Sequence, residues 1–219
     1  MIKKLQLLKS KLLLFVLFFA SSSVCFSQVT FTANPTNAQI TTALTGTGLT
    51  ISSPTLVSGS RSNQIATFTN GSTGGGLQID KGVFFSTGSV TQNLNNRNSS
   101  VSRSDNPSGN YSDPDLTAIA GNAIYNPVVY SFTVTLGLTT TALRLSYQFG
   151  SEEYPDYVGS VFNDVFGFFV TGPGITGTAN MARLPNNSVT AINKVNAGVQ
   201  GFSGSNQAFT LMETAQSAI

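Results

Sequence analysis

The chain has 219 residues, of which only 9% are charged, and its formal net charge is +2. It contains no histidine and a single cysteine, which excludes catalytic triads and metal sites that depend on histidine. Apart from four lysines near the N-terminus, the basic residues are scattered, so no basic face of the kind that binds nucleic acids is expected.

Residues 1–27 have the pattern of a secretory signal peptide. A basic stretch precedes the uncharged apolar residues 12–20, a run too short to span a bilayer as a helix. Cleavage after Ser27 is favoured, because it places small side chains at the two positions that signal peptidase must accept. The alternative is a lipidated Cys25, but a valine stands before it where a lipobox normally has a small residue. We therefore expect an exported protein whose mature N-terminus is Gln28.

Removal of the signal peptide changes the composition of the chain. Without its first 27 residues, the 219-residue chain keeps 192, enough for one domain with a sizeable core. Four of the eleven basic residues and the only cysteine leave with the signal peptide, so seven basic residues remain against nine acidic ones, a net charge of −2. No disulfide is then expected to stabilise the fold, and no transmembrane segment is expected in the mature chain.

Short segments typical of β-strands dominate the mature sequence. They are rich in β-branched and aromatic residues, are bounded by Gly, Asn or Ser, and cover residues 29–33, 48–58, 64–69, 82–86, 127–136, 141–149, 165–171 and 188–195. Helix signals are confined to residues 35–44, capped at Asn34 or Thr36, and to residues 115–120. The pattern predicts a mostly β fold, an antiparallel β-sandwich that is jelly-roll-like.

Three of the predicted strands are expected to be neighbours. Residues 127–136, 141–149 and 165–171 are predicted to form one antiparallel sheet, because a short turn at 137–140 joins the first two. The polar, turn-rich stretch 93–114 is predicted to be a long loop, and long loops in compact domains are usually functional or mobile.

Acidic residues gather in one part of the chain, since seven of the nine lie between residues 105 and 164. Carboxylates at the two ends of a loop can converge on calcium, which takes about six to eight oxygen ligands. The same residues are also consistent with a solvated loop in which Asp and Asn make turn hydrogen bonds, or with a catalytic carboxylate pair. The candidate calcium ligands are Glu152, Glu153, Asp156 and Asp164, with Asp113 and Asp115 from a neighbouring loop.

Two motifs in this acidic region are specific. Residues 151–154 read Ser-Glu-Glu-Tyr, and residues 163–169 read Asn-Asp-Val-Phe-Gly-Phe-Phe. Together with residues 113–116 (Asp-Pro-Asp-Leu) and 82–88 (Gly-Val-Phe-Phe-Ser-Thr-Gly), they resemble the choice-of-anchor L domain over about residues 35–196. The resemblance implies a secreted or cell-surface bacterial protein, commonly of Bacteroidetes type and adhesin-like. It implies no established reaction.

The C-terminal stretch departs from that family. Members usually continue past the region that corresponds to residues 180–196 into further strands rich in acidic and aromatic residues. Residues 197–219 lack this composition and carry no anchor or sorting motif. A sheet that lacks its last strands has open edges. We therefore expect residues 28–219 to form a single domain that is truncated at its C-terminus.

Two functional classes are consistent with these features. The first is a non-catalytic secreted or cell-surface module with an adhesive, binding or structural role, stabilised by calcium, whose partner is an extracellular glycan or protein. The alternative is a carbohydrate-active enzyme that uses Glu153 with Asp164, with Tyr154, Tyr157 and Phe162 stacking on sugar. The absence of tryptophan, and the fit of the neighbouring phenylalanines to a core strand, favour the non-catalytic module.

Overall fold

The structure is a computed structural model of the chain, and it describes residues 28–90, 113–120, 125–151, 153–154, 157–196 and 215–218. Within these residues the strands pair in antiparallel ladders and the helices are short, which confirms the mostly β, antiparallel fold class. The predicted signal peptide, residues 1–27, and most of the predicted loop at 93–114 lie outside the described residues.

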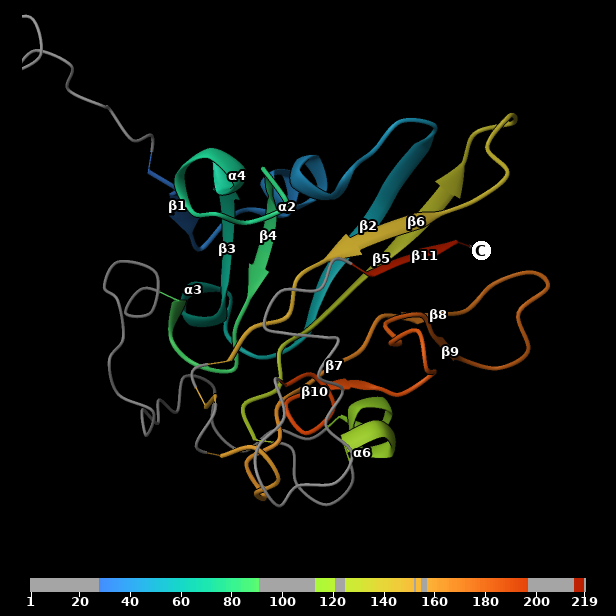
Figure 1. Cartoon of the computed structure of the whole chain (residues 1–219). Coiled ribbons are helices and arrows are strands. Elements are labelled where there is room, and N and C mark those ends of the chain that lie inside the picture. Colours follow the sequence, from blue (N-terminus) through green and yellow to red (C-terminus); the bar gives the residue numbers. More distant parts are fainter. Residues whose placement is uncertain are drawn as a thin grey trace, which may run out of the picture.

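A three-stranded sheet occupies one side of the molecule, in the order β1–β3–β4 (Figure 1). The bounds of its strands are Thr30–Ala33 (β1), Ile65–Thr69 (β3) and Gly82–Phe85 (β4). The central strand is the most buried, because Ile65 and Ala66 have no exposed surface and Phe68 only 8%. The ring of Phe68 lies 6.4 Å from that of Phe31 on the paired strand. All three strands lie within segments predicted from their β-branched and aromatic residues.

A longer two-stranded ladder packs beside this sheet. Its strands are Leu49–Ser58 (β2) and Val129–Leu136 (β5). Ile51 and Val134 are partners on its more buried face, while serines and threonines alternate on the exposed face. This is the pattern of a ladder with one face on a core. The ring of Tyr130 lies 6.3 Å from that of Phe85, which joins the ladder to β4.

One short helix, α2 (Asn37–Leu44), packs against β2, β3 and β4. Thr36 caps it, because the Thr36 hydroxyl accepts a hydrogen bond from Gln39 N at 3.2 Å while Gln39 Oε1 accepts one from Thr36 N at 2.8 Å. This capping box satisfies main-chain N–H groups that the start of a helix leaves without partners. Ile40 is fully buried under the helix. The helix predicted over 35–44 is confirmed.

The prediction that residues 127–136, 141–149 and 165–171 form neighbouring strands of one sheet is wrong. Strand β5 pairs with β2, β6 pairs with β11, and the third segment forms two strands, β7 and β8, which pair with β10 and β9. Alternation along a strand indicates which side chains are buried but not which strand is the partner. The bounds are Arg144–Tyr147 (β6), Val165–Phe166 (β7), Phe169–Val170 (β8), Ala179–Asn180 (β9), Thr190–Ala191 (β10) and Ala215–Ala218 (β11).

The third predicted strand is broken at Gly167, between β7 and β8. A Cβ atom at this position would lie 2.5 Å from the ring of Phe169 and 3.2 Å from Cδ1 of Ile119. Ile119 belongs to helix α6 (Pro114–Ala120), which packs on β7. A larger residue at this position would therefore require the ring of Phe169 to move. The two halves of the segment have different strand partners, β10 for β7 and β9 for β8.

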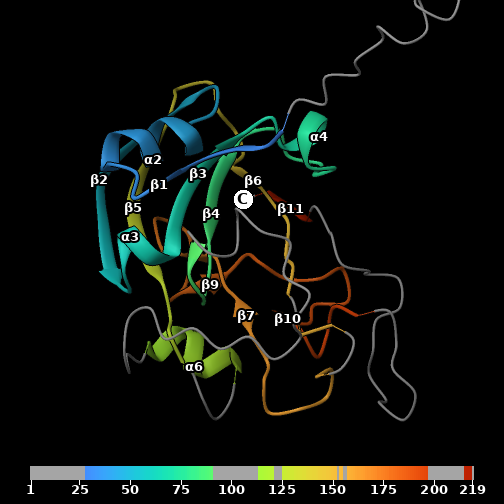
Figure 2. The same ribbon diagram turned by 90° about the vertical axis from the view of Figure 1, so that its left-hand side faces the viewer.

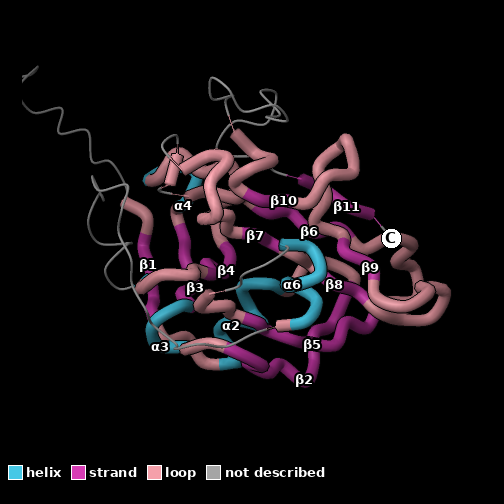
Figure 3. The backbone as a smooth tube through the Cα atoms, turned by 90° about the horizontal axis from the view of Figure 1, so that it is seen from below, coloured by secondary structure: helices cyan, strands magenta, loops and turns pink. Residues whose placement is uncertain are grey.

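The described elements form two regions, which two perpendicular views show (Figures 1 and 2). Strands β1 to β5 with α2 make up the upper part, called here the sheet region. The described residues between 151 and 196, including β7 to β10, make up the lower part, called here the loop region. Helix α6 lies at the lower end, as the view from below also shows (Figure 3). Two single-turn helices, α3 (Arg61–Gln64) and α4 (Gly71–Gly74), flank β3.

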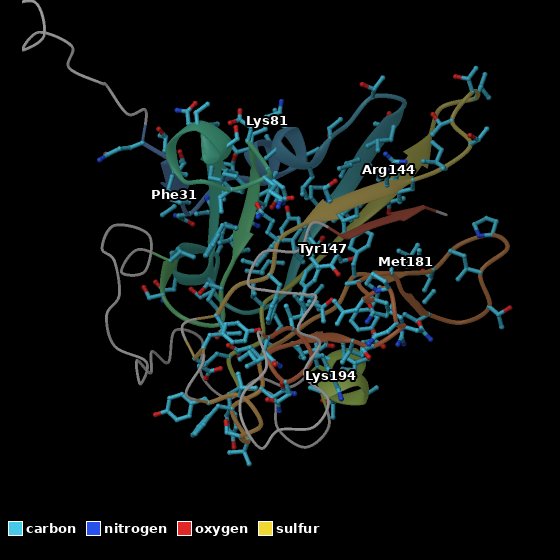
Figure 4. All side chains as sticks on the ribbon, in the orientation of Figure 1. Phe31, Lys81, Arg144, Tyr147, Met181 and Lys194 are labelled. Atoms are coloured by element: carbon cyan, nitrogen blue, oxygen red, sulfur yellow. The ribbon has the colours of Figure 1, made fainter. Side chains whose placement is uncertain are left out.

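Tyr147, at the end of β6, connects the two regions near the centre of the molecule (Figure 4). Its ring lies 4.8 Å from that of Phe166, and its hydroxyl and the Thr190 hydroxyl share a buried hydrogen bond of 2.8 Å. Of the described basic residues, Lys81 lies in the upper part and Lys194 in the lower part of the molecule in the same view. Among the described residues, no helix has the length and apolar character needed to cross a membrane.

Candidate functional site

The acidic motif residues and the turn after β10 lie side by side in the loop region. The β7–β10 ladder pairs Val165 with Ala191, and the main-chain oxygen of Asp164 accepts a hydrogen bond from Ile192 N at 3.1 Å. Because the strands are antiparallel, the residues just before β7 are placed beside those just after β10. The two segments therefore form one structural unit.

Tyr154 is the central side chain of this unit. Its hydroxyl donates a hydrogen bond to the main-chain oxygen of Val195. Burial raises the pKa of the Tyr154 phenol well above its ordinary value, and the charges of Glu153 and Asp164 raise that pKa further. A negative charge opposes ionisation of a phenol only when it is close. Both carboxylates therefore lie close enough to act on the charge of the Tyr154 phenol.

Hydrogen bonds with neutral groups also fix both acidic residues. Asp164 Oδ2 accepts a hydrogen bond from the Thr87 hydroxyl at 3.4 Å, which ties the segment after β4 to the site. Glu153 N donates to Ser151 Oγ at 3.2 Å, Glu153 O accepts from Tyr157 N at 2.9 Å, and Glu153 Oε2 is buried. Two partly buried negative charges that act on one phenol also repel each other.

One amide side chain fixes the loop that precedes β7. Asn193 Oδ1 accepts a hydrogen bond from Gly159 N at 2.5 Å, and Asn193 Nδ2 donates to Ser160 O at 3.2 Å. The main-chain N of Asn193 donates to Asn163 Oδ1 at 2.9 Å. Residues 157–163, called here the tip loop, are thus closed by a residue from outside the loop. Phe162 is exposed at its end.

Comparison with known families shows to which family the chain belongs. Residues 28–218 match the family model of the choice-of-anchor L domain. The chain belongs to the choice-of-anchor L family. The family match extends beyond residues 35–196 on both sides and includes β11, in the C-terminal stretch where the sequence had shown no family pattern. Neither a curated protein nor a solved structure matches the chain.

In this choice-of-anchor L chain, Asp113 and Asp115 lie at the start of α6. Asp113 Oδ1 accepts a hydrogen bond from Leu116 N at 2.8 Å, and Asp113 O accepts one from Thr117 N at 2.9 Å. Asp115 is exposed in the first turn. Carboxylates at a helix N-terminus cap its N–H groups and interact favourably with the helix dipole. Both residues therefore have a structural role in starting α6.

The structure describes four of the six predicted calcium ligands, and Glu152 and Asp156 lie outside the described residues. In the part of the chain that is described, no three Asp, Glu, His or Cys side chains gather so that they could hold a metal ion together. A calcium ion beside Glu153 and Asp164 would therefore need Glu152, Asp156 or main-chain oxygens as further ligands. The calcium site stays a prediction.

The sequence interpretation did not identify Asn193. In the enzyme alternative it also predicted that Tyr154 stacks on sugar, whereas the structure turns this side chain inward. Of the three aromatic residues considered for sugar stacking, Tyr154 bonds inward to Val195, whereas Tyr157 and Phe162 belong to the tip loop. Asn193 had no local signal, because its hydrogen-bond partners lie at least 30 residues away in the sequence. Only the pairing of β7 with β10 brings them together.

Proposed function

We propose that this chain is a non-catalytic binding module that acts in the secreted fraction or at the bacterial cell surface, with an adhesive or structural role. The observation that carries the proposal is the choice-of-anchor L match over residues 28–218, which supports a surface-associated module. The signal-peptide pattern of residues 1–27 supports export. The partner in this proposal is an extracellular glycan or protein.

The environment of the two carboxylates favours binding over catalysis. A glycoside hydrolase places its carboxyl groups on either side of the bond that it cleaves. Here the charges of Glu153 and Asp164 both act on the phenol of Tyr154, whose hydroxyl is bonded to the main chain at Val195. Asp164 further accepts a hydrogen bond from Thr87 and joins the turn after β10. These contacts support a structural role for Asp164 in the loop region.

Calcium is part of the proposal as a stabilising ion rather than as a catalyst. Carboxylates at the two ends of one loop, Glu153 and Asp164, repel each other when both are ionised. A divalent cation would relieve that repulsion and tie the start of β7 to the segment after β6. Magnesium would fit less well, because its small octahedral shell suits a flexible set of carboxylates and carbonyls poorly.

A single assay separates the binding module from the enzyme. The mature protein, residues 28–219, is incubated with cellulose, chitin and xylan, and both the retained protein and the released reducing ends are measured. We expect retention without release of reducing ends. Release that disappears in both Glu153→Gln and Asp164→Asn, with the melting temperature unchanged, would establish the enzyme and contradict the proposal.

A further inference from the structure

The tip loop carries an unusual exposed apolar feature. Val161 and Phe162 are consecutive residues with 86% and 56% of their surface exposed. Tyr157 packs against Phe162 from the other end of the loop, with ring centroids 5.3 Å apart and planes at 81°. An edge-to-face pair of this kind leaves a ring face that the partner ring does not cover. The loop therefore presents an aromatic surface to solvent.

This aromatic surface is held in place. The Asn193 amide bonds to the main chain at Gly159 and at Ser160, and Ser160 N donates to Tyr157 O at 3.0 Å. Phe162 N donates in turn to Ser160 Oγ at 3.1 Å. A loop fixed in this way loses little conformational entropy when a ligand binds to it. Preorganisation of exposed apolar side chains is a property of binding surfaces rather than of ordinary solvated loops.

The charges around the tip loop indicate which ligands fit. Two acidic residues flank the loop in the sequence, Glu153 before it and Asp164 after it. One exposed basic residue, Lys194, follows Asn193. Without calcium the two carboxylates repel anionic lipids and anionic polymers at close range, and a calcium ion bound between them would cancel their charge. The surface is therefore suited to a neutral ligand.

The small size of the surface further limits the class of ligand that can bind there. Its apolar part consists of three side chains, Tyr157, Val161 and Phe162. A stable protein interface uses roughly 20–30 residues on each side, so a folded protein partner would find too small a contact here. One aromatic ring matches the area of one sugar ring, whose C–H face carries slightly positive hydrogens that the negative face of an aromatic ring attracts.

We propose that the tip loop binds a neutral polysaccharide, with the ring of Phe162 stacked on the C–H face of one sugar unit and Tyr157 supporting that ring. This proposal rests on the proposed binding function and names its ligand class and contact surface. It places the ligand on the loop itself, next to the carboxylates but without a role for them in any reaction.

The test measures binding isotherms of the mature protein on insoluble cellulose, chitin and xylan. We expect wild type to bind at least one of the three, and Phe162→Ala to bind it about tenfold more weakly, because the stacking ring is lost. Phe162→Tyr keeps the ring and is expected to stay within about twofold of wild type. Leu138→Ala is the matched control, because Leu138 is fully exposed at the turn after β5, outside the tip loop.

The melting temperature of each variant shows whether it is folded, and Val161→Asp provides a second disruption at a more exposed position. The proposal would be overturned if wild type bound none of the three polysaccharides. Equal binding by wild type and Phe162→Ala would also overturn it, as would binding to alginate or to phosphatidylglycerol vesicles in place of the neutral polymers. Retention that persists in Phe162→Ala contradicts only the tip loop as the surface, whereas reducing-end release contradicts the proposed function.

Discussion

The sheet region and the loop region are stabilised in different ways. In the sheet region, strands of four to ten residues pair along main-chain ladders, and α2 begins with its own capping box. In the loop region, the ladders between β7 and β10 and between β8 and β9 are two residues long. Side chains such as Asn193, Asp164 and Tyr154 make many of the remaining connections there.

This difference has a functional consequence. A region closed by main-chain ladders tolerates most surface substitutions, because main-chain hydrogen bonds hold its strands together. A region closed by individual side chains depends on each of them, but it can place those side chains freely in space. The loop region is therefore the part of this family member suited to presenting a ligand surface, and the sheet region is its scaffold.

The largest effect is expected from a core substitution in the scaffold. Ile65→Ala in β3 should lower the free energy of unfolding by about 2–5 kcal/mol, because Ile65 is fully buried and the lost side chain leaves a cavity. Urea unfolding measures this change. Val57→Ala, at an exposed position in β2, is the control and should change stability by less than about 0.5 kcal/mol. Equal effects of the two substitutions would mean that β3 is not the core of the sheet region.

Calcium should stabilise the loop region if the proposed site forms. At a hundredfold excess over its Kd, a single bound ion adds about 2.7 kcal/mol, so the melting temperature should rise with calcium and fall again with chelator. Glu153→Ala or Asp164→Ala should remove most of this response. Asp80→Ala is the control, because Asp80 bonds to Ser72 far from the site. A melting temperature that does not change up to millimolar calcium would leave a solvated acidic loop.

The Asn193 side chain should matter more than an exposed amide normally does. Asn193→Ala removes two hydrogen bonds that close the tip loop and should cost about 1–2 kcal/mol. Asn193→Asp keeps the acceptor for Gly159 N but places a carboxylate oxygen against Ser160 O, so it should be destabilising as well. Chemical denaturation with both variants measures these changes. If neither variant changes stability, side-chain hydrogen bonds do not hold this loop.

Alkaline pH should weaken the fold through Tyr154. Its folded-state pKa is raised above the ordinary value of 10.0, because of burial and the nearby carboxylates. The unfolded chain therefore loses this proton first, and stability should fall as the pH rises above about 10, by less than about 1.4 kcal/mol per pH unit since the ring is partly exposed. Unfolding of Tyr154→Phe between pH 8 and pH 11 should show a shallower loss. The same slope in both proteins would contradict the placement of this hydroxyl.

The sequence predicted the strands of the sheet region well, because their signals are local. Alternation and β-branched residues indicated β1, β2, β3 and β4, and cap candidates at Asn34 or Thr36 indicated the start of α2. The same signals did not predict strand partners, since pairing brings together residues far apart in sequence. For this reason β5 was assigned to the wrong neighbour, and the 165–171 segment was not seen to break at Gly167.

The candidate site was only partly accessible from the sequence. Clustered carboxylates stand out in a chain with 9% charged residues, so Glu153 and Asp164 could be found by composition and spacing. The helix-capping role of Asp113 could have been recognised from the proline and the apolar residues that follow it. No sequence pattern indicated that Asn193 closes the tip loop, because its hydrogen bonds form only after β7 and β10 have paired.

Hydrogen–deuterium exchange with and without a bound neutral polysaccharide tests the division between scaffold and ligand surface most directly. The account predicts that binding slows exchange of the amides at Gly159, Ser160 and Phe162, while exchange in β1, β3 and β4 stays unchanged. Protection that appears instead on the exposed face of the β2–β5 ladder, or that leaves the tip loop unaffected, would contradict the account.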